Sequence, residues 1–179
     1  MFFSKRLLAA LICGSSISIA NLAVAGQVDR LPPANQCLTK AYTIDSSRKG
    51  LNVRQQPNLS GKILGRLPKI TEVNVLGMQG KWTLISVIDP IDQKVNFRGE
   101  GWVYSSLLGV SSQGYNLASV SLYNQPSLRS KVVGKIPPNT NTTILGCSGR
   151  WLRVESKHHR YQGWLEPNQQ CAAAYTSCS

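Results

Sequence analysis

The side chains with the most obvious chemistry in this chain are its two histidines and its eight carboxylates. His158 and His159 are adjacent, and neighbouring side chains on a strand point to opposite faces, so we do not expect them to share one metal ion. Asp89 and Asp92 stand on either side of Pro90, in a stretch typical of a solvated turn. Catalysis needs a positioned nucleophile, base or metal, and no spacing in the chain predicts one. We therefore expect a protein that is not an enzyme, with no catalytic residue, no metal site and no cofactor.

The chain contains one sequence motif twice, and each copy of this motif includes a tryptophan. Residues 75–85 are VLGMQGKWTLI and residues 144–154 are ILGCSGRWLRV, an offset of 69 positions. The match extends upstream without a gap, over 51–74 and 120–143. Downstream, GEGWVY aligns with YQGWLE at an offset of 62, because the first copy carries seven extra residues. The sequence therefore consists largely of two tandem copies of one unit.

Each copy is expected to be built from short strands. Apolar runs recur between Gly, Pro, Asn and Ser, and none of them has a helical period. Val73 and Val75 alternate with Glu72 and Asn74, as in a strand that buries one face. MQGK and CSGR place a glycine between two strands, which is typical of a tight hairpin. Because short strands in so few residues hide their edges by curling up, we expect an all-β fold of two tandem small β-barrels.

The order of these motifs resembles a known family. LNVR, the following Pro and Gly, VLG, GKW and the closing GEGWV of the first copy are similar to the bacterial SH3 domain, and the second copy resembles it more loosely. The resemblance implies SH3-like barrels at residues 39–109 and 110–168. They would lie between an N-terminal segment, 26–38, and a cysteine-containing tail, 169–179.

Related domains use aromatic side chains in shallow peptide grooves, so the resemblance also implies ligand-binding residues. Aromatic rings offer a large contact area at a low entropy cost. The candidate ligand-binding residues are Trp102, Trp164, Tyr104, Tyr123, Asn52 and Arg54. Packing inside the barrel is the alternative for Trp102 and Trp164. Trp82 and Trp151 each follow a turn and begin an apolar strand, so we expect them in the core.

The two copies are not expected to bind identically. The second copy has Ser121 and Tyr123 at the positions of Asn52 and Arg54. Any role that depends on that amide and that guanidinium is therefore confined to the first copy.

Residues 1–25 are expected to be a cleaved signal peptide. Lys5 and Arg6 precede an apolar stretch that ends at Ala23-Val24-Ala25, a small-x-small cleavage site. Serines and an asparagine interrupt this stretch, so we do not expect a permanent membrane span. The mature chain would begin at Gly26, contain no transmembrane segment and be secreted to the periplasm or the extracellular space.

The mature chain would keep four cysteines, an even number that is typical of two disulfides in an oxidising compartment. None of them belongs to a CxxC pair, so zinc binding and redox chemistry are not expected. The favoured pairing joins Cys147 to either Cys171 or Cys178, and Cys37 to the other of these two. A local bridge between Cys171 and Cys178 is the alternative.

The chain carries a formal net charge of +12, with basic residues scattered along both copies. Without Lys5 and Arg6 the charge falls by two, to +10. This charge indicates either solubility or attraction to an anionic surface such as wall polymer or anionic lipid; nucleic acid is not an expected partner in that compartment. The resemblance implies a secreted, non-catalytic protein that binds cell-wall peptide or glycan. The alternative is an adaptor or inhibitor that holds a partner protein.

Overall fold

The computed structural model describes residues 36–87, 95, 97–114 and 116–172. The expected signal peptide, both aspartates of the insert and Cys178 lie outside these residues. Within the described part, the chain forms strands and short 3-10 turns and no α-helix, which confirms the all-β prediction. No helix in this part is long and apolar enough to cross a membrane.

The strands follow the two copies in order. The first copy contains β1 (Gln36–Thr43), β2 (Leu51–Arg54), β3 (Ile63–Leu67), β4 (Glu72–Gln79), β5 (Trp82–Val87), β6 (Gly99–Tyr104), the 3-10 turn η2 (Ser105–Leu107) and β7 (Leu108–Ser112). The second contains β8 (Val120–Tyr123), β9 (Val132–Ile136), β10 (Asn141–Ser148), β11 (Trp151–Ser156), β12 (Tyr161–Leu165), the 3-10 turn η3 (Pro167–Gln169) and β13 (Gln170–Cys171).

The local sequence accounts for the hairpins that the repeat predicts. Gly80 and Gly149 have φ angles of +58° and +55°, and each stands between two paired strands of its copy. A residue with a side chain rarely adopts such angles, so glycine fixes both turns. In β4, Val73 and Val75 are buried while their neighbours are half-exposed, as the alternation predicts. The two copies therefore build the same hairpin from the same signals.

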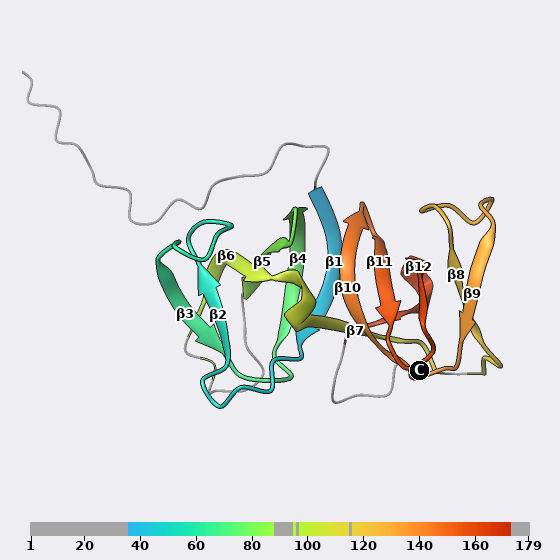
Figure 1. Ribbon diagram of the computed structural model, residues 1–179, viewed down its shortest axis with the longest axis horizontal. Helices are drawn as coiled ribbons and strands as arrows, with labels where there is room; N and C mark the ends of the chain where they lie inside the picture. The colour runs from blue at the N-terminus through green and yellow to red at the C-terminus, as the bar shows by residue number, and fades with distance from the viewer. Residues whose placement is uncertain (1–35, 88–94, 96, 115, 173–179) are drawn as a thin grey trace, which may run out of the picture.

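All described strands belong to one sheet (Figure 1). Their order is β3-β2-β6-β5-β4-β1-β7-β10-β11-β12-β8-β9, and β13 pairs with β7. This path is open, so the expected closure into two separate barrels is not confirmed. Counted inward from either outer edge of the sheet, the equivalent strands of the two copies follow one another in the same order. The β1–β7 pair forms the central seam, and β3 and β9 are the equivalent outer strands.

Strand β7 belongs to both copies. It pairs with β1 through Leu108 and Gly109, and with β13 through Ser111 and Ser112. The Ser112 hydroxyl donates to the Pro137 carbonyl (3.0 Å) and accepts from the Thr140 amide (2.9 Å). At the equivalent place, Thr43 of β1 makes the same two contacts with Pro68 and Thr71. The chain therefore uses β7 as the last strand of copy one and the first of copy two, and the boundary predicted between 109 and 110 falls inside it.

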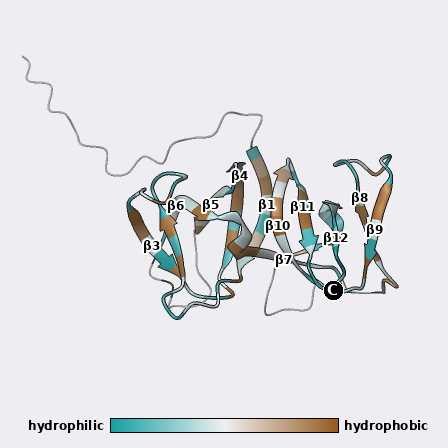
Figure 2. Ribbon diagram, viewed as in Figure 1, coloured by the Kyte–Doolittle hydropathy of each residue, from teal (hydrophilic) through white to brown (hydrophobic). Residues whose placement is uncertain are grey.

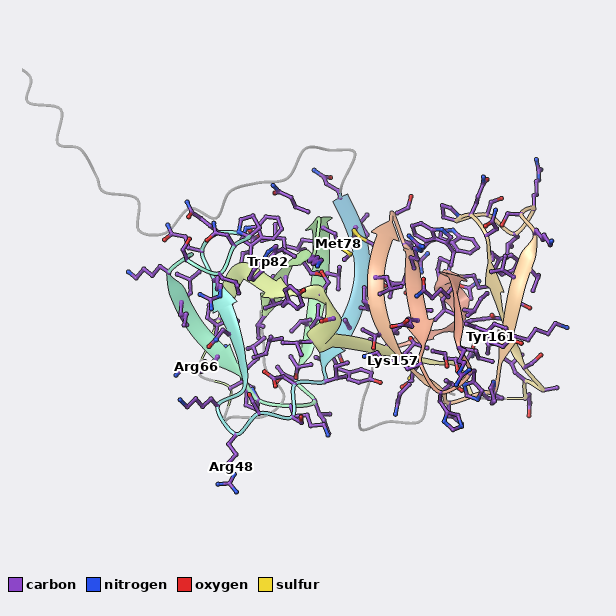
Figure 3. All side chains as sticks on the ribbon, in the orientation of Figure 1. Arg48, Arg66, Met78, Trp82, Lys157 and Tyr161 are labelled. Atoms are coloured by element: carbon purple, nitrogen blue, oxygen red, sulfur yellow. A yellow bond between two sulfur atoms is a disulfide. The ribbon has the colours of Figure 1, made fainter. Side chains whose placement is uncertain are left out.

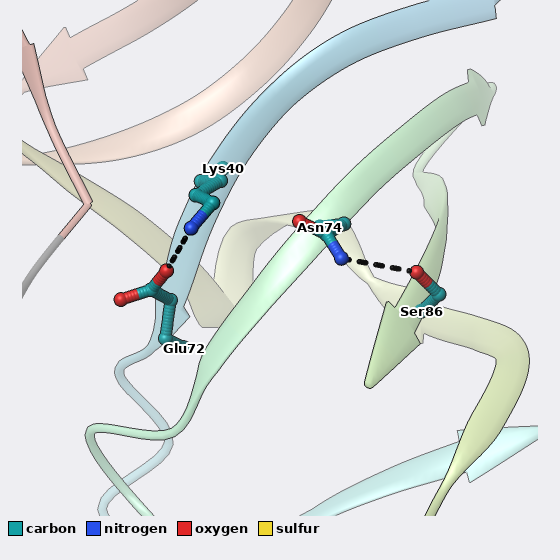
Figure 4. A network of polar contacts seen from close by, with 4 residues as sticks. All are labelled: Lys40, Glu72, Asn74 and Ser86. Atoms are coloured by element: carbon teal, nitrogen blue, oxygen red, sulfur yellow. Dashed lines mark hydrogen bonds and ion pairs between the residues drawn. The ribbon is translucent and has the colours of Figure 1, made fainter. Parts of the chain in front are cut away.

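The buried core extends through both copies and uses equivalent positions. Val53, Leu67, Ile85 and Val103 of copy one correspond to Leu122, Ile136, Val154 and Leu165 of copy two, and all are fully buried. Figure 2 shows apolar residues gathered on the strands and polar ones in many of the connecting loops. The outer face of β1, β4 and β5 carries polar pairs, in contrast to the apolar core. Lys40 Nζ lies 2.6 Å from Glu72 Oε1, and Asn74 donates to Ser86 (3.3 Å) (Figure 4).

A disulfide between Cys37 and Cys147 joins the two copies, with the Cα atoms 6.0 Å apart. The favoured pairing of Cys147 with a tail cysteine is therefore wrong. The reason is that β1 runs past its pairing with β7 and reaches the β10–β11 turn, where the Leu38 amide donates to the Gly149 carbonyl (2.9 Å). Cys171 is disulfide-bonded as well. Its alternative partner, Cys178, lies outside the described residues.

Candidate functional site

The outer face of copy one carries its aromatic candidates. Directly paired residues on neighbouring antiparallel strands share a face of the sheet. The register pairs Trp82 with Tyr104, and it pairs Trp102 with both Leu84 and Arg54. Because side chains two positions apart on a strand also share a face, all five residues lie on the same side of the sheet.

Trp102 is nevertheless fully buried, at 0% exposure, and Leu84 beside it is buried too. The Nε1 atom of Trp102 has no hydrogen-bond partner in the described part of the chain. Arg54 extends from the same face and its Nη1 donates to the Gly61 carbonyl (2.9 Å), which draws the 55–62 loop toward this face. The expectation that Trp102 lines an open groove is therefore corrected, and the alternative of packing holds for this residue.

Trp82 and Tyr104 form the accessible part of this face. Their ring centroids are 5.6 Å apart at an interplanar angle of 83°, an edge-to-face contact, and both side chains are half-buried. Trp82 was expected in the core. It lies outside the core because it is the first residue of β5, directly after the turn, and its position points to the outer face.

Copy two places three aromatic side chains on its outer face. Trp151 packs edge-to-face on Tyr123, with ring centroids 5.7 Å apart at 87°, and Tyr123 is paired with Trp164 across β8 and β12. All three are half-buried, and we name them the aromatic cluster. Trp164 therefore has the accessibility that its predicted role requires. Trp151 was expected in the core, and this prediction is wrong.

A single substitution between the copies explains part of this difference. Arg153, which is exposed and paired with Trp164, stands where copy one has the buried Leu84. In copy one, the apolar Leu84 packs beside a covered tryptophan. In copy two, a charged side chain borders an open one, so the aromatic cluster faces solvent together with a cation.

Asn52 and Arg54 make contacts within the protein. Arg66 Nε donates to Asn52 Oδ1 (2.9 Å), and Arg54 holds Gly61 as described above. Both contacts stabilise the hairpin of β2 and β3. One polar atom of each side chain therefore has a partner within the protein, and their predicted part in ligand binding stays a prediction.

A groove with a volume of about 620 Å³ opens between the turn before β2 and strand β3. Its lining contains four cations and no carboxylate; we name it the basic groove. The lining residues are Ser47, Arg48, Lys49, Gly50, Ile63, Leu64, Gly65, Arg66, Pro68 and Lys69. Inspection of the sequence missed this site because its charges come from two separate segments, and neither forms a dense run by itself. The short Ser-Ser-Arg-Lys-Gly stretch at 46–50 was the available signal.

The seam between the copies holds a partly buried polar network around Tyr42. The Tyr42 hydroxyl lies 2.9 Å from Ser111 Oγ and donates to Asn141 Oδ1 (2.9 Å), which also accepts from Ser111 (2.7 Å). Burial raises the pKa of Tyr42 above its ordinary value of 10.0, and the hydrogen bond with Ser111 opposes this in part. The network joins β1, β7 and β10, so it serves the packing of the two copies.

The histidines do not form a metal site in the described part of the chain. Their rings meet edge-to-face, with centroids 4.8 Å apart, and His159 Nδ1 lies 2.8 Å from Ser156 Oγ. No group of three or more His, Cys, Asp or Glu side chains that could hold a metal ion occurs among the described residues.

Comparison with known proteins identifies both copies. The family model described as the bacterial SH3 domain matches residues 49–109 and 118–169. No curated protein matches the chain. Similar solved structures include NlpC2 and NlpC1 from Trichomonas vaginalis, at 18% and 14% identity and TM-scores of 0.29 and 0.31. Another is an NlpC/P60 family protein from Bacillus cereus ATCC 10987, at 20% identity and a TM-score of 0.25. These alignments cover 80%, 84% and 61% of this chain but only 49%, 52% and 37% of the three structures, about half of their length or less.

Proposed function

Because this chain belongs to the bacterial SH3 domain family and carries the domain twice, we propose that it is a secreted, non-catalytic protein that binds cell-envelope polymer. The ligand class is the peptide or glycan of the cell wall, and the binding surface is the outer face of the copies. The family also supports the proposal that each copy curls as a small SH3-like barrel.

The observation that carries this proposal is the aromatic cluster of copy two. Tyr123, Trp151 and Trp164 lie half-exposed on one face, and Arg153 borders them. Aromatic rings of this kind present a flat apolar surface with a polar edge, which suits sugar rings and extended peptides. The adjacent guanidinium can donate hydrogen bonds to carbonyl or carboxylate groups of such a ligand.

Charge and disulfide bonding support the location of this activity. Without Lys5 and Arg6 the net charge of +12 falls by two, to +10, which favours capture by an anionic envelope because the attraction raises the local concentration of the polymer around the protein. A disulfide between two copies of a small domain is typical of proteins outside the cytoplasm.

The test is a pull-down of the purified protein on isolated peptidoglycan at low and high salt. We expect binding that weakens as salt rises, and about tenfold weaker binding for Trp164→Ala and Trp151→Ala, a loss of about 1.4 kcal/mol each. Leu128→Ala is the matched control, because Leu128 is a 62% exposed apolar residue of copy two outside the aromatic cluster. Circular dichroism of each variant checks that the fold persists.

Three results would contradict the proposal. Cluster variants that fold and still bind as the parent protein would rule out the aromatic cluster as the binding surface. Release of soluble fragments from the peptidoglycan would show catalysis. Failure to bind isolated wall, together with retention of one defined protein, would instead favour an adaptor or inhibitor.

A further inference from the structure

We propose that the basic groove of copy one is a second binding site, for the anionic oxygens of a polymer that carries phosphate or carboxylate groups. This site goes beyond the aromatic surface and rests on a separate set of side chains. It deepens the proposed function by naming the charge class of an envelope polymer that the protein would hold.

The groove gathers cations from two segments. Arg48 and Lys49 belong to the turn before β2, while Arg66 lies on β3 and Lys69 just after it. All four residues are exposed. Figure 3 shows Arg48 extending from the lower end of copy one, with Arg66 above it on the same part of the molecule.

These cations have no anionic partner within the described residues. The ion pair found there, between Lys40 and Glu72, lies on β1 and β4, away from the groove. Asp45 is close in sequence but does not line the groove, and its Oδ1 accepts a hydrogen bond from the Ser47 amide (2.8 Å). Like charges held together repel one another, so an anion that enters the groove relieves this repulsion.

One of the four cations is already oriented. Asn52 Oδ1 accepts from Arg66 Nε, which leaves the two terminal nitrogens of this guanidinium with no acceptor among the described residues. A fixed guanidinium loses less side-chain entropy when it binds, and its planar fork matches the oxygens of phosphate and carboxylate groups. The groove therefore offers one oriented donor and three further exposed positive charges around it.

Copy two provides an internal comparison. In this region the two copies align without a gap at the offset of 69 positions. The equivalent strands β1 and β7, which precede the groove segment, and the segments 51–74 and 120–143, which follow it, both align at this offset. The positions of the four groove cations are occupied in copy two by Leu117, Ala118, Lys135 and Pro138. Three of the four charges are absent there, so the site is specific to copy one and cannot follow from the shared fold alone.

The experiment measures binding of the full protein to fluorescent polyphosphate and to fluorescent polygalacturonate, with neutral dextran as a blank. The groove variant is Arg48→Gln with Lys69→Gln, which keeps Arg66 and its contact with Asn52. The control is Arg129→Gln with Lys157→Gln, which removes the same two charges from exposed sites of copy two. We expect the groove variant to bind about tenfold more weakly at low salt, and the control variant within about twofold of the parent.

Each outcome decides the matter. A loss confined to the groove variant supports the site, and the polymer with the larger loss identifies phosphate or carboxylate as its ligand. Equal losses in both variants would show general charge attraction, and unchanged binding would show that the groove binds no anion; either result overturns the proposal. Binding of Trp164→Ala to peptidoglycan is measured in parallel. If Trp164→Ala loses peptidoglycan binding while the groove variant keeps its binding to both charged polymers, this inference alone is overturned. If the groove variant loses polymer binding while Trp164→Ala still binds peptidoglycan as the parent does, only the role of the aromatic cluster is overturned.

Discussion

Among single residues, the tryptophans differ in how much they are expected to contribute to stability. Trp102 is fully buried, whereas Trp151 is half-exposed on the aromatic cluster. We expect Trp102→Ala to lower the free energy of unfolding by about 3–5 kcal/mol, the range typical of a buried tryptophan. Trp151→Ala should cost clearly less, because part of its surface is already in water. Urea titrations of the two variants measure both values; equal losses would contradict the assignment.

Tyr42 gives the protein a defined response to alkaline pH. Its pKa is higher in the folded state than the ordinary value of 10.0, because burial disfavours the phenolate. The stabilisation by neutral Tyr42 is therefore complete below pH 10 and is lost as the pH rises from 10 through the folded pKa. We expect the free energy of unfolding to fall over that range, measured by urea titration at several pH values.

Tyr42→Phe is the matched variant for this prediction. It removes the titrating group and two hydrogen bonds to Ser111 and Asn141. We expect it to be less stable by about 1–3 kcal/mol at neutral pH, since each bond contributes about 0.5–1.5 kcal/mol. Its alkaline loss should be smaller than that of the parent, and an identical pH profile would exclude Tyr42 as the cause.

The sequence predicted neither the face of every aromatic residue nor its accessibility. Period-two alternation places Trp102 and Tyr104 on one face, but the shared face with Trp82 follows from the strand register, and alternation does not say what covers a residue. Trp102 is fully buried and is paired with Arg54, whose contact with Gly61 depends on the conformation of a loop. The sequence therefore did not predict that Trp102 is fully buried while Trp164 and Tyr123 of copy two stay half-exposed, and the part of these residues in binding stays a prediction.

Among the elements, β7 is the one on which both copies depend. A Cβ atom at Gly109 would lie 2.7 Å from Ile44 Cγ2 and 3.0 Å from the Thr142 carbonyl oxygen. We expect Gly109→Ala to lower the free energy of unfolding by about 1–3 kcal/mol, as typical of overpacking. Hydrogen exchange should show weaker protection in the strands of both copies.

Gly146→Ala is the control for this variant. Gly146 lies in β10, and a Cβ atom there would meet Arg153 Cβ at 3.4 Å, an ordinary contact. We expect its stability to stay within about 0.5 kcal/mol of the parent. Loss of protection in only one copy of the Gly109→Ala variant would contradict the shared role of β7.

The repeat was sufficient to predict most strands and both tight hairpins, because these depend on local glycines and on alternation. It was not sufficient to show that residues 107–116, expected as a short connection, contain β7. Leu108 and Val110 alternate as in any strand, but whether that strand pairs with one copy or with both depends on residues far away in the chain. The disulfide of Cys37 depends on the same seam, and for the same reason the favoured pairing of Cys37 with a tail cysteine was wrong.

On the scale of the whole molecule, we expect the two copies to unfold together. They share β7, the core extends through both, and the bridge between Cys37 and Cys147 closes a separation of 110 residues. Calorimetry should show one transition. Cys37→Ser with Cys147→Ser should lower the free energy of unfolding by about 2–4 kcal/mol and still give one transition. Two separate transitions in the parent protein would contradict this prediction.

The position of β7 also decides when the nascent chain can complete its first domain. As the chain is synthesised, β4 becomes available early to pair with one edge of β1, but the other edge of β1 can pair only once β7 has been made. In turn, β7 can pair with β10, and Cys37 can form its disulfide with Cys147, only after the second copy has been made. An unpaired strand edge is a template for pairing with another chain. A chain that stops before β7 therefore carries an open edge on β1 and lacks the Cys147 with which Cys37 forms its disulfide, so premature termination there produces a species prone to aggregate.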